Sequence, residues 1–127
     1  MNKSESFKIE PFGIRLHIIC GEDDFIIKEM KSIEARDEVI SILPKRLMEC
    51  DAITYKEVYE DDGFLIDRLF LISKESIQSD IVAHESYHIL NMVFETIGHT
   101  PSLDNDEIEA YVFQSIFSKI NSFYNEG

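Results

Sequence analysis

Basic residues and cysteines are scarce in this chain, and both shortages exclude classes of function. Only 12 of the 127 residues are Lys or Arg, against 25 Asp or Glu, which gives a formal net charge of −13. A protein that binds the phosphate backbone needs clustered Lys and Arg, so we expect no nucleic-acid partner. The two cysteines, Cys20 and Cys50, allow one disulfide at most. We expect both to be free thiols in a reducing cytosol.

Long apolar runs and linkers are also missing. No stretch approaches the roughly 18 apolar residues that a membrane-spanning helix needs. The N-terminal segment MNKSESFKIEPFGIRL lacks the apolar core of a signal peptide, so we expect a cytoplasmic protein with no membrane partner. The chain has no repeat, no low-complexity tract and no linker rich in Pro, Gly or Ser. Residues 1–127 are therefore expected to form a single domain, and a hydrophobic content of 44% suffices for its core.

The N-terminal half is predicted to consist mostly of strands. Residues Gly13–Cys20 alternate apolar and polar side chains, which is the period of a half-buried strand, and the acidic segment Gly21–Asp24 is expected to break it. Residues Ala52–Ile72 form a predicted hairpin. Its turn is Glu60–Gly63, where Gly63 is expected to adopt positive φ, and its second strand, Phe64–Ile72, is strongly apolar.

Helical periodicity dominates the second half. Apolar residues recur at steps of three and four from Ile77 until Gly98, a typical helix stop. A last helix is expected from about Asp106 to Phe123. Ser32–Leu43 also has roughly helical spacing, with Pro44 just beyond, and its structural type stays open. Strands first and two helices last indicate an α+β fold, in which a small antiparallel or mixed sheet packs on two C-terminal helices.

The first of those two helices carries the motif His84-Glu85-Ser86-Tyr87-His88, an H-E-x-x-H. Residues i and i+4 of a helix lie on the same face, so His84 and His88 can bind one metal ion. Zinc suits this ligand type, and it lowers the pKa of a bound water toward neutrality. Glu85 lies beside the histidines and is the candidate general base. The alternative is that both histidines are half-buried residues of an apolar helix face.

A third ligand is sought on the last helix. Glu107 follows His88 by 19 residues, which leaves room for one helix to end, a loop to turn and a second helix to pack back. Ala110, one turn later, would allow the two helices to approach closely. Asp104, Asp106 and Glu109 compete with Glu107 for this role, and each can also favour a helix N-terminus through its charge.

This pattern resembles the gluzincin arrangement of zinc metallopeptidases, in which an H-E-x-x-H helix is followed by a Glu on the next helix. The segment Glu107-x-Glu109-Ala110-x-x-Phe113 is similar to the E-x-E-A-x-x-F signature of ImmA/IrrE-type peptidases, and the region also resembles small H-E-x-x-H proteins encoded by bacteriophages. The resemblance covers about residues 81–117. Tyr87 stands where such motifs usually have a small residue.

The resemblance implies a minimal zincin-like fold that binds one Zn²⁺ through His84, His88 and Glu107, with Glu85 as general base. An edge strand would bind the extended peptide by β-addition. A donor to the developing oxyanion is also needed; Tyr111 is the candidate, with His99 and Tyr87 as alternatives.

The function expected from these features is a zinc-dependent peptidase of phage or mobile-element origin that hydrolyses a protein or peptide substrate. The excess of acidic residues favours a basic substrate, and a phage-encoded protein would act in the host cytosol or in the virion. Two other classes stay open: a non-catalytic interaction or virion protein with the same fold, and an acidic inhibitor that mimics nucleic acid. The oligomeric state also stays open.

Overall fold

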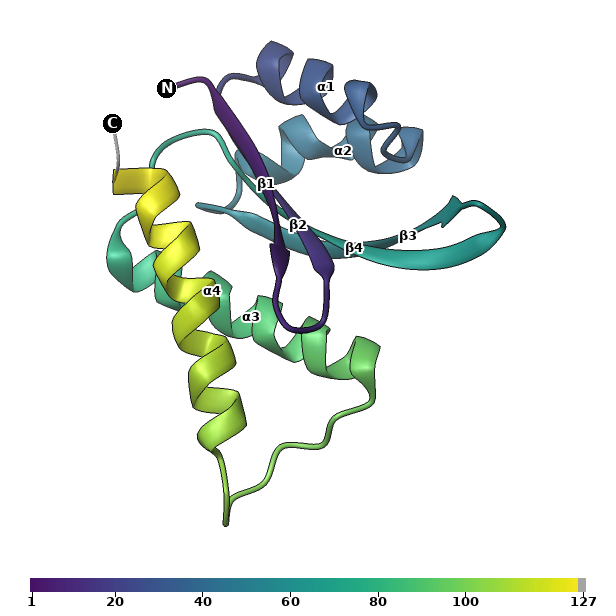
Figure 1. The fold of residues 1–127 in the computed structure, drawn as a ribbon. Coiled ribbons are helices and arrows are strands. Elements are labelled where there is room, and N and C mark those ends of the chain that lie inside the picture. Colours follow the sequence, from purple (N-terminus) through teal and green to yellow (C-terminus); the bar gives the residue numbers. More distant parts are fainter. Residues whose placement is uncertain (126–127) are drawn as a thin grey trace.

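Within residues 1–125, which the computed structural model describes, four strands form one sheet and four helices cover its two faces (Figure 1). The elements follow the chain in the order β1 (Lys3–Ile9), β2 (Ile14–Cys20), α1 (Asp23–Ser32), α2 (Asp37–Leu47), β3 (Ile53–Asp61), β4 (Phe64–Ser73), α3 (Ser79–Ile97) and α4 (Glu107–Asn125). The α+β class predicted from the sequence is confirmed. No helix of the described chain is long and apolar enough to cross a membrane.

The sheet is mixed, with the strand order β1-β2-β4-β3. β1 runs antiparallel to β2, β2 runs parallel to β4, and β3 returns antiparallel to β4. The central strand β4 carries Leu69–Ile72, which are fully buried because helices cover both faces of the sheet there. β3 is therefore an edge strand whose outer side no described strand covers.

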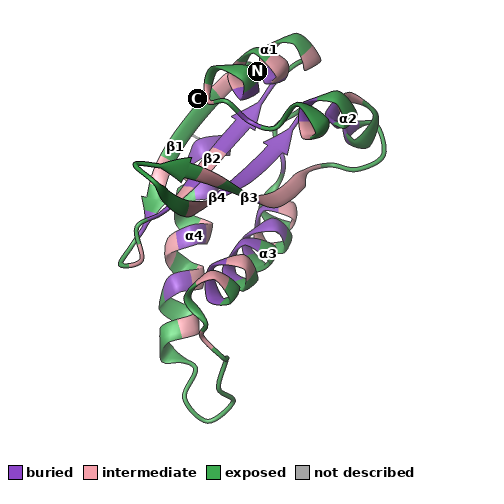
Figure 2. Cartoon of the chain, turned by 90° about the vertical axis from the view of Figure 1, so that its right-hand side faces the viewer, coloured by how far each residue is buried: buried purple, intermediate pink, exposed green. Residues whose placement is uncertain are grey.

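Each face of the sheet has its own hydrophobic cluster. α1 and α2 pack against Ile19, Phe70 and Ile72 on one face. α3 and α4 pack against the opposite face, where Leu16 and Ile18 of β2 are fully buried. Figure 2 shows the buried central strands between these two layers. The two C-terminal helices thus form one layer against the sheet, as predicted, but they are only half of its cover.

Two helices between the strands correct the sequence-based prediction. Gly21–Asp24 does not simply break the chain, because α1 begins at Asp23 and buries Ile26 and Met30, one turn apart. Asp23 and Asp24 lie in its first turn, where negative charge stabilises a helix N-terminus. An acidic segment after a strand can therefore start a helix as well as a turn.

α2 decides the segment Ser32–Leu43, whose structural type the sequence left open. It begins at Asp37 and continues through Pro44 to Leu47. Proline removes one backbone hydrogen bond from a helix interior. The helix nevertheless continues, because Ile40, Leu43 and Leu47 all pack into the same cluster on the sheet.

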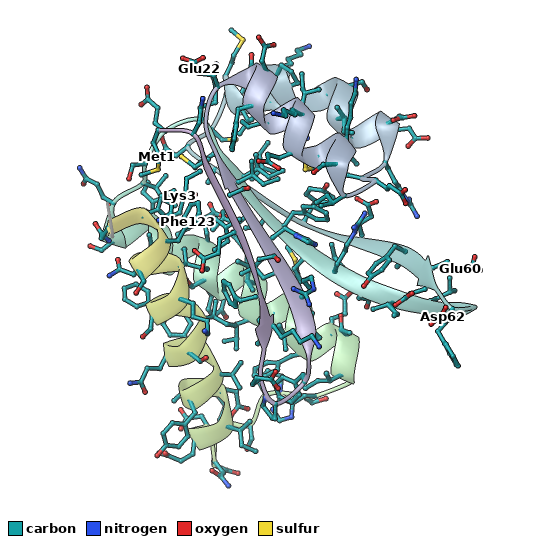
Figure 3. The ribbon with its side chains drawn as sticks, turned by 45° about the horizontal axis from the view of Figure 1, so that its top comes forward. Met1, Lys3, Glu22, Glu60, Asp62 and Phe123 are labelled. Atoms are coloured by element: carbon teal, nitrogen blue, oxygen red, sulfur yellow. The ribbon has the colours of Figure 1, made fainter. Side chains whose placement is uncertain are left out.

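The β3–β4 hairpin was predicted correctly and reaches beyond the rest of the sheet. Asp62 and Gly63 both have positive φ and join the strands in a two-residue turn. β2 pairs with β4 only from Arg68 onward, so the outer part of the hairpin projects as a two-stranded arm with Glu60 and Asp62 at its tip (Figure 3). Phe64 and Leu65 on this arm are 72% and 78% exposed.

A buried ion pair ties the α1–α2 connection to the sheet. Arg68 of β4 donates hydrogen bonds to the carbonyl oxygens of Ile33 and Glu34, at 2.8 and 3.2 Å, and pairs with Glu57 of β3 at 3.4 Å. Glu57 also accepts the backbone N–H of Arg36. Arg68 and Glu57 are only 6% and 5% exposed, so neither charge has water as an alternative partner.

Replacing Arg68 should therefore lower the free energy of unfolding of the protein. Arg68→Met leaves the Glu57 carboxylate buried without its cation, and we expect a loss of about 3–5 kcal/mol in the free energy of unfolding, measured by urea denaturation. Arg15→Met is the matched control. Arg15 lies opposite Arg68 in the β2–β4 register but its side chain bonds only an exposed serine hydroxyl, so the expected loss is under about 1 kcal/mol. Equal losses would contradict the role of the buried pair.

Candidate metal centre

The H-E-x-x-H motif lies in the first half of α3, as predicted, and the helix ends at Gly98 in the left-handed conformation. Val82, Ile89 and Val93 of α3 are fully buried against the sheet and α4. His84 and His88 are on the exposed side of the same helix. The helix therefore presents both imidazoles away from the core.

The Nε2 atoms of the two imidazoles lie close together. Their Nε2 atoms lie 3.1 Å apart, so that without a metal one nitrogen donates its proton to the other. Two nitrogens bound to one tetrahedral Zn²⁺ at about 2.0–2.1 Å lie about 3.3 Å apart. The separation of the two Nε2 atoms is therefore close to the separation of two nitrogens bound to one zinc ion.

Glu85 lies between the histidines and the core. It is only 7% exposed, and the side chain of Thr54 on β3 is hydrogen-bonded to its carboxylate. Burial raises the pKa of Glu85 above its usual value, although the neighbouring His84 and His88 act in the opposite direction. A buried carboxylate whose proton affinity is raised suits a group that accepts and returns a proton.

A cavity of about 540 Å³ opens in front of the motif. The end of α2, the start of β3 and the first half of α3 form its walls. Its lining residues are Arg46, Cys50, Asp51, Ala52, Ile53, Thr54, Asp80, Ile81, His84, Glu85 and His88. The edge strand β3 therefore lies directly beside the histidine pair. This agrees with the expectation that the hairpin preceding the motif supplies an edge at the site.

The structure does not bring Glu107 to the histidines. Glu107 is exposed at the first residue of α4, and the start of α4 lies against the end of α3, where Glu109 accepts a hydrogen bond from His99 at 3.0 Å. The end of α3 is about 15 Å along the helix from His88. Figure 1 shows the first turn of α4 far from the sheet, whereas its last turn lies near the start of α3. Glu107 as a ligand stays a prediction.

The other residues considered on the last helix and its loop lie at the same distant end. Tyr111, the candidate oxyanion donor, is 67% exposed and does not line the cavity. His99 packs against the ring of Phe94 and bonds Glu109, so it has a structural partner. Tyr87 lies on α3 itself but is 58% exposed and is also absent from the cavity lining. Asp104 and Asp106 are exposed in the loop before α4.

The sequence patterns missed the residues that the other walls contribute. Asp80 was detectable, because it precedes His84 by one helical turn and so belongs to the same row of side chains. No sequence pattern indicated that Asp51 and Thr54 line the cavity. They reach the cavity only because β3 pairs with β4 in a register that places its first residues beside α3. Both cysteines are free, as expected, and Cys50 is one of the lining residues.

No family model, no curated protein and no solved structure matches this chain. Within residues 1–125, no group of three His, Cys, Asp or Glu side chains is close enough together, as it stands, to hold a metal ion. What the chain presents is two neighbouring imidazoles, a buried carboxylate beside them and an acidic cavity in front.

Glu85 should lower the stability of the metal-free protein at neutral pH. Because its pKa is raised by burial, the folded protein binds this proton more tightly than the unfolded chain, whose glutamate titrates near about 4.3. The stabilising contribution is present below that pH and is lost as the pH rises through the folded-state pKa. Glu85→Gln should therefore need more urea for unfolding than the wild type at pH 7, with a difference that shrinks toward pH 4.

Glu57→Gln is the matched control, since it alters the other buried glutamate. Glu57 has the Arg68 cation beside it, so removing its charge should destabilise the protein at pH 7. If both substitutions lower the free energy of unfolding at pH 7, Glu85 is a paired carboxylate that stabilises the fold. The interpretation of Glu85 as a buried functional group that destabilises the fold would then be wrong.

Proposed function

We propose that the protein is a zinc-dependent peptidase of the zincin type, which holds the metal through His84 and His88 and uses Glu85 as general base. The observation that carries the proposal is the distance of 3.1 Å between the two Nε2 atoms, with a buried glutamate beside them. The combination matches what two helical ligands and one proton-transferring group must provide.

The proposed peptide hydrolysis depends on proton transfer to and from the Glu85 carboxylate. Zn²⁺, when bound, supplies a water of lowered pKa and polarises a substrate carbonyl. Glu85 accepts a proton from the attacking water and returns it to the leaving amine when the peptide bond breaks. The side chain of Thr54 interacts with this carboxylate, and both residues line the cavity.

The edge strand β3 supports a peptide as substrate. Its inner side pairs with β4, and no described strand pairs with its outer side. Backbone groups on such an edge can add an extended peptide as a further strand. The residues Ile53 and Thr54 line the cavity, so a peptide added there would lie beside the histidine pair.

The charges around the cavity favour a basic substrate. Asp51, Asp80 and Glu85 line it, against a single cation, Arg46. The formal charge of the chain is −13, so a basic segment would be attracted both at the surface and at the site. The substrate class is therefore a protein or peptide with Lys or Arg near the scissile bond.

A non-catalytic interaction protein is the second candidate, and the projecting β3–β4 arm favours it. Phe64 and Leu65 are largely exposed beside the acidic residues of the hairpin turn. Large exposed apolar side chains on a two-stranded ribbon are typical of contact with another protein. In this case a metal would have a structural role or none.

Measurement of zinc and of proteolysis separates the two candidates. Purified wild type is expected to bind one Zn²⁺ and to cleave a mixture of basic peptides, with products identified by mass spectrometry. Glu85→Gln should keep the zinc and lose about 10²- to 10⁴-fold in cleavage rate, because it removes the general base. His88→Ala should lose both.

His99→Gln is the control, because this histidine lies at the other end of α3 and should leave zinc and activity unchanged. Wild type that stays free of zinc after zinc is added would contradict the proposal. One bound zinc without cleavage of any basic peptide would favour the interaction protein.

A further inference from the structure

We propose that Asp51, which directly precedes β3, supplies the third protein ligand to the metal held by His84 and His88. The inference rests on the proposed function, since it concerns the same metal. It differs from the prediction made from the sequence motif, which assigns this role to Glu107 on α4.

The third ligand has to come from another wall of the cavity. His84 and His88 already occupy one face of α3, and a catalytic zinc takes three protein ligands with a fourth position left open. The carboxylates and thiols that line the cavity with them are Cys50, Asp51, Asp80 and Glu85. Glu107 and Glu109 lie at the far end of α3.

Asp80 and Glu85 are excluded by their place on the helix that carries the histidines. Asp80, His84 and His88 are on three successive turns, and the first and last of them are about 12 Å apart along the axis. A short aspartate side chain cannot reach an ion that lies between the two histidines. Glu85 is only 7% exposed, its carboxylate interacts with Thr54, and the proposed function assigns it the role of general base.

Cys50 is directed toward a different partner. Its Sγ donates to the carbonyl oxygen of Arg46 at 3.2 Å, which orients the thiol back onto the end of α2. Asp51, by contrast, is exposed and makes no hydrogen bond or ion pair with any residue that the structure describes. Its carboxylate is therefore free to rotate toward an ion in the cavity without breaking an existing contact.

The position of Asp51 suits a ligand that closes the site from outside α3. It lines the same cavity as the histidines, on a different element of the fold, and its negative charge acts on Glu85. The β3–β4 ladder begins at Ile53, paired with Ile72, so the backbone two residues before it is anchored. A cation between Asp51 and the histidines would also screen Asp51 from Glu85, which removes the repulsion between these two carboxylates.

Metal affinity tests the assignment without relying on activity. Zn²⁺ binding to metal-free protein is measured by competition with a chelating dye, and Co²⁺ binding by the visible absorption of the protein-bound ion. Asp51→Asn should weaken Zn²⁺ binding at least 10-fold and reduce the Co²⁺ absorption, because the loss of one ligand changes the coordination. Urea unfolding of the metal-free variant should match the wild type, since Asp51 is exposed and unpaired.

Three controls make the result specific. Asp80→Asn, Cys50→Ser and Glu107→Gln should each change the Zn²⁺ affinity less than about threefold, because none of these side chains is a ligand. The first of them removes the same charge from the same cavity as Asp51→Asn, so it separates ligation from general electrostatic attraction.

The failure of this assignment is distinguishable from the failure of the proposed function. If Glu107→Gln weakens binding and Asp51→Asn does not, Asp51 is not the ligand, although the zinc site itself stands. Equal losses of Zn²⁺ affinity for Asp51→Asn and Asp80→Asn would also overturn the assignment, since general electrostatic attraction would then explain both. Wild type without zinc would overturn both proposals.

Discussion

The packing of α3 on the sheet fixes what the H-E-x-x-H motif presents at the cavity. The helix has one apolar face, and burying Val82, Ile89 and Val93 leaves it a single rotation about its own axis. At 3.6 residues per turn, Glu85 then lies about 60° from the centre of that face, and the histidines about 120–160° from it. Glu85 is therefore at the border of the core and the imidazoles are in solvent. The site is thus a consequence of hydrophobic packing.

Local periodicity was sufficient to predict this part of the site, because every interaction involved lies within two turns of one helix. The same holds for Gly98 and for the turn at Gly63, whose positive φ values are local properties. Predicting the position of Glu107 required a further piece of information, the direction in which α4 crosses α3. α4 places its last turn, not its first, near the start of α3, where Tyr124 bonds Ser73 and Ser76. No spacing in the sequence sets that direction.

Tertiary contacts also explain helix α1, which was not predicted, and helix α2, whose segment was left open between structural types. Each is short, with 10 and 11 residues, and α2 contains Pro44, which argues against a helix when read alone. Both form because Phe70 and Ile72 of the central strand need a cover on that face. Arg68 then ties the connection between these helices to the sheet by bonding Ile33 and Glu34. Tertiary contacts override local preference here.

The two buried glutamates show how the same residue type is used in opposite ways. Glu57 has a cation and a backbone N–H as partners, so its charge is compensated inside the protein. Glu85 has the side chain of Thr54 and two histidines beside it, and no Lys or Arg among the causes that lower its pKa. Asp51 and Asp80 add further negative charge at the same cavity, against Arg46 alone. A divalent cation would balance this excess, and the acidic surplus is thus concentrated where a metal and a basic substrate would both be attracted.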